Sequence, residues 1–221
     1  MVRISKIFLA DPLSFTTFST HLKSTNMKVA ALIGFLLFSL NGSGQNILPT
    51  DVQIKTALLA APPDQQSETT VLGYNPSGKL VTLKKGNGPL ICLADDPKLK
   101  GIKVACYSVK LEPFMARGRE LVVEGKTEAQ KKEAREQEIK SGKLKMPDVP
   151  TMLYVYSGKE EDYDKATGEL KEGNYRYVVY VPYATLESTG LPAKPFQPGM
   201  PWLMDPGTYG AHIMITPPTK K

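Results

Sequence analysis

The segment PLICLADDPKLKGIKVACYS (residues 89–108) contains both cysteines of the chain and decides how its sheet is built. Two short runs of β-forming residues flank a turn-like stretch that holds Pro97 and Gly101. A hairpin about this turn places Cys92 opposite Cys106, and opposed residues at a non-hydrogen-bonded position lie close enough for a disulfide. The alternative is two buried free thiols, but an exported protein meets an oxidising compartment that favours the disulfide.

A second segment, MKVAALIGFLLFSLNGSGQ (residues 27–45), is typical of a signal peptide. Lys28 supplies the positive start, an apolar run of about a dozen residues follows, and Gly42 and Gly44 are the small residues that precede a cleavage site. The alternative is an uncleaved membrane anchor, but a spanning helix needs about 20 apolar residues. We therefore predict that residues 1–44 are a signal peptide with an N-terminal extension and that the mature protein is secreted or periplasmic.

Composition limits the classes of function. The predicted mature part, residues 45–221, is long enough for a single domain with a hydrophobic core. The formal net charge of the whole chain is +6, and it falls to about +3 without the basic signal peptide. So small an excess argues against a nucleic-acid-binding protein. We expect no cofactor, no stable membrane span after cleavage, and a small molecule or a component of the cell envelope as the partner.

Local patterns at the start of the predicted domain indicate a helix and a hairpin. A helix is expected at residues 50–61, where Thr50 or Asp51 can cap the first turn. A hairpin is expected at residues 69–84 about the turn Asn-Pro-Ser-Gly (75–78). Together with the cysteine hairpin, these strands predict a four-strand antiparallel meander.

The middle of the chain has helical patterns, and its end returns to strand patterns. Thr127 and Gln130 form a capping box for a helix whose charged faces place it at the surface. The predicted helices are 109–125 and 127–142, the predicted strands are 151–158, 174–183 and 211–216, and loops are expected at 159–173 and 187–202. Strands, then helices, then strands indicate an α+β single domain that has a mainly antiparallel sheet with two to three helices.

Several stretches resemble an uncharacterised family of exported bacterial proteins with no assigned activity. They are ICLADDP, ACYS, LEPFMARGREL, SGKLKMP, PYAT, STGLP, PWLMDPGT and AHIM. The resemblance implies export, and it transfers no catalytic residue.

Motifs that carry a known chemistry are missing from the sequence. The segment GRELVVEGKT (118–127) has the wrong glycine spacing for a phosphate-binding loop, and DYDKATGE (162–169) places its glycine one residue late for a calcium loop. The sequence contains no G-x-S-x-G, H-E-x-x-H or C-x-x-C pattern. The first hypothesis is therefore a non-catalytic ligand-binding or structural domain.

Tyrosines are concentrated on two predicted strands. Tyr154 and Tyr156 share a face of one strand, and Tyr175 and Tyr177 share a face of the next, whereas Tyr180 takes the opposite face. Such aromatic pairs stabilise a sheet, and we favour packing in the core. The alternative is an exposed platform that stacks on a sugar or another flat ligand.

His212 is the only histidine of the predicted mature chain. The last predicted strand puts His212 and Met214 on one face, and a turn before it can bring Asp205 back toward the imidazole. One alternative is therefore a secreted hydrolase that uses Asp205 and His212. Another is a copper-binding protein that uses His212 with Met200, Met204 and Met214. Both lack further members of their sites, so we favour a histidine that is structural or lines a ligand cleft.

Overall fold

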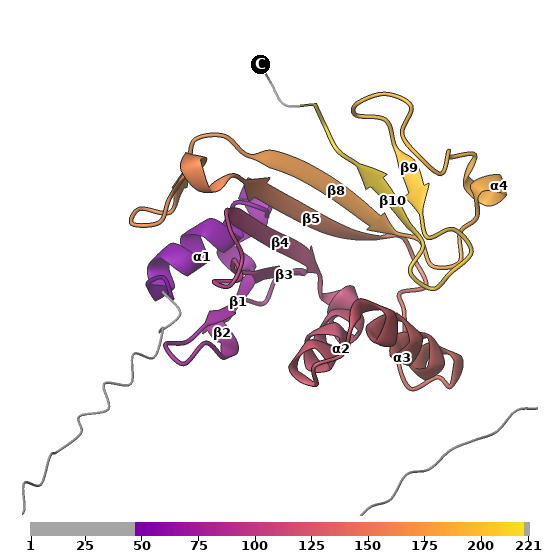
Figure 1. Cartoon of the computed structure of the whole chain (residues 1–221), viewed down its shortest axis with the longest axis horizontal. Coiled ribbons are helices and arrows are strands. Elements are labelled where there is room, and N and C mark those ends of the chain that lie inside the picture. The colour runs from indigo at the N-terminus through magenta and orange to yellow at the C-terminus, as the bar shows by residue number, and fades with distance from the viewer. Residues whose placement is uncertain (1–46, 219–221) are drawn as a thin grey trace, which may run out of the picture. The chain divides into compact units, whose positions relative to one another are not determined.

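The computed structural model describes residues 47–218, and an eight-stranded sheet forms their centre (Figure 1). The order of the strands is β2-β1-β3-β4-β5-β8-β10-β9. They are β1 (Thr70–Tyr74), β2 (Leu80–Lys84), β3 (Leu90–Leu93), β4 (Ile102–Ser108), β5 (Thr151–Gly158), β8 (Asn174–Tyr180), β9 (Trp202–Met204) and β10 (His212–Ile215). This confirms the predicted α+β single domain with a mainly antiparallel sheet. The predicted signal peptide lies outside the described residues.

The cysteine hairpin is confirmed. Strands β3 and β4 pair antiparallel with Cys92 directly opposite Cys106, and their Cα atoms are 4.0 Å apart. The two residues form a disulfide, and both are fully buried. This link therefore joins two neighbouring strands inside the core.

The predicted antiparallel meander is wrong in one pairing. Strands β1 and β2 form the expected hairpin, closed by a hydrogen bond from Gly78 N to Asn75 O at 2.8 Å. Strand β1, however, lies between β2 and β3 and runs parallel to β3. The reason is the path after β2, where Gly88 N donates to Glu68 O at 2.8 Å, beside the start of β1. This contact brings the chain back to the end of the sheet where β1 begins, so β3 starts in the same direction.

Three helices of nine or more residues accompany the sheet: α1 (Thr50–Leu58), α2 (Glu112–Val123) and α3 (Glu128–Lys140). The capping box of Thr127 and Gln130 begins α3 as predicted. The predicted cap of the first helix is wrong, because Thr50 and Asp51 already lie inside α1. Pro49 occupies the cap position without a side-chain hydrogen bond, and its carbonyl oxygen accepts from Gln53 N at 3.0 Å.

Short elements occur in segments that were predicted to be loops. They are β6 (Tyr163–Asp164) and β7 (Glu169–Leu170) in the first predicted loop, and α4 (Leu186–Thr189) and β9, which overlap the two ends of the second. Thr185 and Ser188 form a capping box that supports α4, and pairing with β10 supports β9. Elements of two to four residues carry too little periodicity to be recognised in a sequence.

The sheet packs against helices on both faces. Alternating residues of a strand point to opposite faces. Accordingly, Cys106 faces α1, where its Sγ lies 3.4 Å from Ala57 O, whereas Tyr107 faces α2 and donates to Glu112 Oε2 at 2.6 Å. Figure 1 shows α1 and the α2–α3 pair at different ends of the sheet. None of the helices in residues 47–218 has the length and apolarity that crossing a bilayer requires.

Candidate functional site

The strongest candidate site surrounds Arg135 on α3. Its guanidinium lies over the ring of Phe114, with the central carbon 4.2 Å from the ring centroid. Among residues 47–218 the guanidinium has no hydrogen-bond or ion-pair partner, and its Nε atom is buried. Burial lowers the pKa of Arg135, because removing the cation from water disfavours its charged form. An arginine nevertheless keeps its proton at every physiological pH, so this position holds an uncompensated positive charge.

The neighbouring arginine shows how unusual this is. Arg117 on α2 donates from Nε to both carboxylate oxygens of Glu138 at 2.9 Å and from Nη1 to Glu120 and Glu124. This cluster joins α2 to α3 and occupies Glu138, which lies one turn beyond Arg135 on α3. Arg135 is therefore left without the acid that its own helix could have offered.

Local sequence explains why Arg135 points inward. Ile139 lies one turn further along the same side of α3 and packs against the cluster of Phe114, Leu144 and Tyr209. Gly118 of α2 leaves room for the guanidinium, because a Cβ at this position would collide with it.

Arg135 faces a cleft of about 350 Å³ between the α2–α3 pair and the end of the sheet. Phe114 contacts the rings of Tyr180 and Tyr209 edge to face, and Tyr209 donates to Lys132 O at 2.9 Å. Burial raises the pKa of Tyr180 and of Tyr209, so both phenols stay neutral. One wall of the cleft therefore consists of packed aromatic rings.

The acids of the cleft are already bound to lysines. Lys131 Nζ binds Glu128 Oε1 at 2.5 Å, and Lys132 Nζ lies 3.5 Å from Asp205 Oδ1. Each lysine neutralises the acid that it binds, which leaves the charge of Arg135 uncompensated.

His212 lies in the same cleft, and the structure defines its tautomer. Its Nδ1 is 2.7 Å from the carbonyl oxygen of Gly210. A carbonyl can only accept, so Nδ1 carries a proton and donates to Gly210 O. The ring also packs against Tyr180, with the centroids 5.3 Å apart.

The predicted pairing of Asp205 with His212 is not formed. Both residues line the cleft, but the carboxylate of Asp205 lies beside Lys132, and a backbone carbonyl orients the imidazole instead. Asp205 adopts a positive φ of 51°, which places it at the corner that leads out of β9. The two residues that the hydrolase hypothesis needs are thus near one another but not hydrogen-bonded.

Only two of the three methionines of the copper hypothesis lie near His212. His212 pairs with Met204 across β10 and β9, and Met214 shares the same face of β10. Met204 is exposed, Met214 is buried, and Met200 lies in a separate groove beside Trp202. In the described part of the chain, no group of three or more His, Cys, Asp or Glu residues is arranged to hold a metal ion.

Four of the five tyrosines of β5 and β8 form one ladder on the sheet face that packs against α1. Tyr154 is opposite Tyr177, and Tyr156 is opposite Tyr175. The ring centroids of Tyr156 and Tyr175 are 4.5 Å apart, and Tyr175 Oη donates to Leu59 O at 3.0 Å. Tyr154 and Tyr156 pack against the core around the disulfide. These contacts favour the packing interpretation over a ligand platform.

The fold and the cleft together define a small α+β domain with a cationic cleft that has aromatic walls. Comparisons of the chain with protein-family models, with curated proteins and with solved structures found no match. The resemblance to a family of exported proteins therefore stays a prediction.

Sequence reasoning missed Arg135, which it took as part of a solvated charged face. One signal was available, because Arg135 lies on the same helical stripe as Ile139, Lys131 and Lys132. The three cations of this stripe lie next to Ile139. This pattern indicates that the basic side of the helix, rather than a fully solvated one, packs against the rest of the domain.

Proposed function

We propose that this chain is an exported, non-catalytic protein that binds a small molecule through a carboxylate or phosphate group at Arg135. The observation that carries the proposal is the half-buried guanidinium without an acceptor among residues 47–218. Leaving a buried donor unpaired costs free energy, and an anion that binds it recovers that cost. Arginine also offers a fork of donors that matches carboxylate and phosphate oxygens.

The rest of the cleft fits an organic ligand. Phe114, Tyr180 and Tyr209 offer ring surfaces next to the charge, and small-molecule sites typically combine such walls with few polar groups. Lys131 and Lys132 lie at the rim, where each is paired with an acid, so the net positive charge of the cleft comes from Arg135. The ligand we propose therefore carries an anionic group and an apolar or aromatic body.

A binding role is better supported than the hydrolase hypothesis. Asp205 contacts Lys132 rather than His212, and the hydroxyl of Thr208 in the cleft donates to Asp205 O at 2.8 Å. A nucleophile needs a base that hydrogen-bonds it, and the described side chains of the cleft show no such pair.

Export rests on the sequence of residues 27–45 and is supported by the buried disulfide. Disulfides persist in oxidising compartments and are rare in the cytosol of most cells. The Cys92–Cys106 bond is therefore the expected companion of a signal peptide.

The binding proposal can be tested by titrating the purified protein with benzoate and phenyl phosphate, with neutral benzamide as the uncharged analogue. The Nε–H resonance of Arg135 reports directly on the guanidinium in ¹⁵N-resolved NMR spectra. Arg135→Met removes the charge but keeps an apolar stem over Phe114. The matched control is Arg176→Gln, since Arg176 is exposed on β8 and donates to Thr216 Oγ1 at 3.3 Å.

We expect the anions to shift the Arg135 signal and to bind the wild type and the Arg176 variant equally. Loss of the Arg135 guanidinium should weaken binding by about ten- to hundredfold, the value of a charge-assisted hydrogen bond. Equal binding of benzamide, or an unchanged affinity in Arg135→Met, would contradict the proposal.

A further inference from the structure

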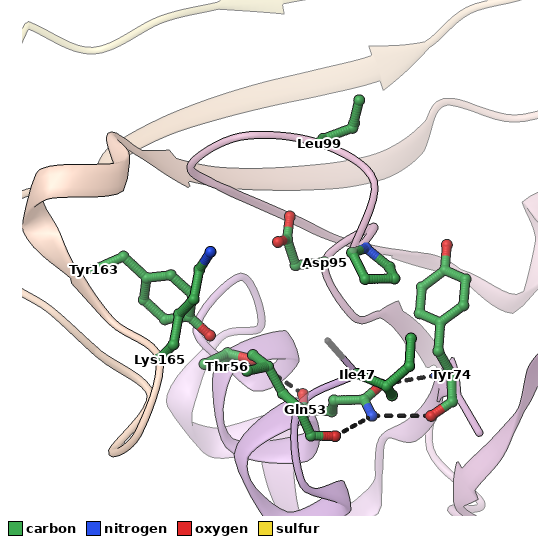
Figure 2. A pocket seen from close by; sticks show the side chains of 10 residues that line it. Ile47, Gln53, Thr56, Tyr74, Asp95, Leu99, Tyr163 and Lys165 are labelled. Carbon is green, nitrogen blue, oxygen red and sulfur yellow. Dashed lines mark hydrogen bonds between the residues drawn. The ribbon is translucent and has the colours of Figure 1, made fainter. Parts of the chain in front are cut away.

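A second, smaller pocket lies between α1, the β3–β4 loop and the β6 segment (Figure 2). Its volume is about 70 Å³. Ile47, Leu48, Pro97 and Leu99 supply apolar walls. The pocket shares no lining residue with the Arg135 cleft, so it is an independent site.

Two polar side chains of the pocket already hydrogen-bond to the backbone. Gln53 donates from Nε2 to Leu48 O at 2.8 Å and to Tyr74 O at 2.9 Å, while its Oε1 accepts from Tyr74 N at 2.7 Å (Figure 2). The hydroxyl of Thr56 donates to Val52 O at 2.9 Å. These side chains hold the start of α1 against β1 and leave little capacity for a ligand.

The phenol oxygen of Tyr163 can still accept a hydrogen bond. Its side chain is 7% exposed, yet its phenol oxygen makes no hydrogen bond with residues 47–218. Thr56 Oγ1 adjoins it, but the proton of Thr56 is directed to Val52 O, so Thr56 can only accept from the phenol and donates nothing to its oxygen. Most buried hydroxyls are hydrogen-bonded, so this oxygen calls for a partner that the described chain does not supply.

Asp95 also lacks a partner for its charge. Its Oδ1 accepts from Lys103 N at 2.8 Å, but it forms no ion pair within the described residues. Lys165 lines the same pocket, but its Nζ binds Glu160 Oε1, and Glu160 Oε2 in turn accepts from Gly101 N at 2.6 Å. Figure 2 shows Asp95 above the pocket, with Tyr163 and Lys165 on one side and Tyr74 on the other.

We propose that this pocket binds the ammonium group of a small aliphatic primary amine. An ammonium group has three N–H donors and a positive charge. The carboxylate of Asp95 can accept from it and balance its charge, and the buried phenol oxygen of Tyr163 can accept a second bond. The apolar walls contact the short carbon chain, and ring faces such as that of Tyr74 attract cations.

Other occupants fit less well. An anion would meet Asp95 in a partly desolvated site, where like charges repel strongly. A neutral apolar molecule would leave the phenol of Tyr163 and the charge of Asp95 without partners. Water can fill the volume, and it is the outcome that a failed titration would establish.

The proposal implies a pH dependence. Burial raises the pKa of Asp95 to about 6. Asp96 and Glu160 contribute to this increase, whereas the Lys103 N–H and Lys165 oppose it. Ammonium binding requires the ionised carboxylate, so affinity should fall as the pH drops below about 6. By linkage, a bound amine should lower the pKa of Asp95.

The proposal can be tested by titrating the purified protein at pH 7.5 and constant ionic strength. The titrants are propylammonium, neutral 1-propanol and anionic propionate. The amide signals of Asp95 and Lys103 report on binding in NMR spectra. Asp95→Asn keeps the acceptor for Lys103 N and removes the charge, and Tyr163→Phe removes the phenol oxygen. Asp96→Asn is the matched control, because it removes a neighbouring carboxylate that does not line the pocket.

We expect propylammonium to bind one to one, more tightly than propanol, with propionate excluded. Asp95→Asn should weaken binding by at least about tenfold, Tyr163→Phe should weaken it less, and Asp96→Asn should leave it nearly unchanged. Saturating propylammonium should also lower the pKa of Asp95 in the wild type, a readout that needs no variant. The proposal is overturned if propanol binds as well as propylammonium, if Asp95→Asn has no effect, or if no signal moves.

Discussion

His212 donates from Nδ1 to the carbonyl oxygen of Gly210, 2.7 Å away, so the backbone rather than Asp205 orients the only histidine of the described chain. A carboxylate partner would stabilise a protonated imidazole, as in a catalytic triad. A neutral carbonyl supplies no such charge, and it only fixes the orientation of the ring. This arrangement suits a side chain that shapes a cleft better than one that shuttles protons.

The Cys92–Cys106 disulfide should contribute strongly to stability. It closes a sequence separation of 14 residues, and a loop of about that size is worth about 3 kcal/mol in the chain-entropy model. We expect the Cys92→Ala/Cys106→Ala variant to lose about this much free energy of unfolding in urea. Reduced wild-type protein should behave in the same way. Peptide mapping that recovers two freely alkylated cysteines from native protein would contradict the bond itself.

The disulfide was predictable because it depends on local sequence. A turn of known length sets the register of a hairpin, so the pairing of Cys92 with Cys106 follows from their spacing about the turn. The parallel pairing of β1 with β3 does not follow from any turn. It depends on the contact of Gly88 with Glu68, which are 20 residues apart on the two sides of the β1–β2 hairpin.

The candidate site was predictable only in part, for a related reason. The strand register that places His212 and Met214 on one face follows from alternation. The isolation of Arg135 depends on a competition between helices, in which Arg117 of α2 takes the carboxylate of Glu138. Such a competition is decided by tertiary packing, which spacing along a single helix does not show.

Tyr107 should anchor α2 to the sheet. It is fully buried, donates to Glu112 Oε2 at 2.6 Å and accepts from Arg119 Nη1 at 2.9 Å. Tyr107→Phe should lower the free energy of unfolding by about 1–2 kcal/mol, since two charge-assisted hydrogen bonds are lost while Glu112 and Arg119 still bind each other. Tyr175→Phe is the control. Its phenol is partly exposed, so we expect a loss of about 0.5 kcal/mol. Equal losses in urea titrations would count against this role.

Asp95 should make stability depend on pH in the unusual direction. Burial raises its pKa from 3.8 to about 6 in the folded protein, so the folded state binds more protons than the unfolded state between these values. Its contribution to stability therefore falls as the pH rises from about 4 to about 6 and stays constant above. Asp95→Asn should remove this dependence and stabilise the protein at pH 7.5 by at most about 2 kcal/mol, because the partly exposed carboxylate is screened by water.

The measurement is the difference between the unfolding free energies of wild type and variant from pH 4.5 to 7.5. Taking the difference removes the contributions of other acids. A difference that does not change over this range would show that Asp95 titrates normally.

Export predicts a defined N-terminus. Cleavage after Gly44 would make Gln45 the first residue of the mature protein. N-terminal sequencing, or intact-mass analysis of protein from the periplasm or the medium, should give a start at Gln45 or within a few residues of it. Recovery of an uncleaved chain that begins at Met1 or Met27 from the cytoplasm would refute this prediction.

His212 should not hold copper tightly. Cu(I) prefers thioethers, thiolates and imidazoles, but both cysteines are in the disulfide, Met200 lies in another groove and Met214 is only 9% exposed. His212 and Met204 then remain as the accessible pair, and two ligands of this kind bind a soft metal only weakly. In a titration with Cu(I) against a competing chelator, we expect the metal to stay with the chelator for the wild type, for His212→Ala and for the control Met204→Leu. Tight one-to-one binding that disappears in His212→Ala would instead establish a soft-metal site on this face of β10.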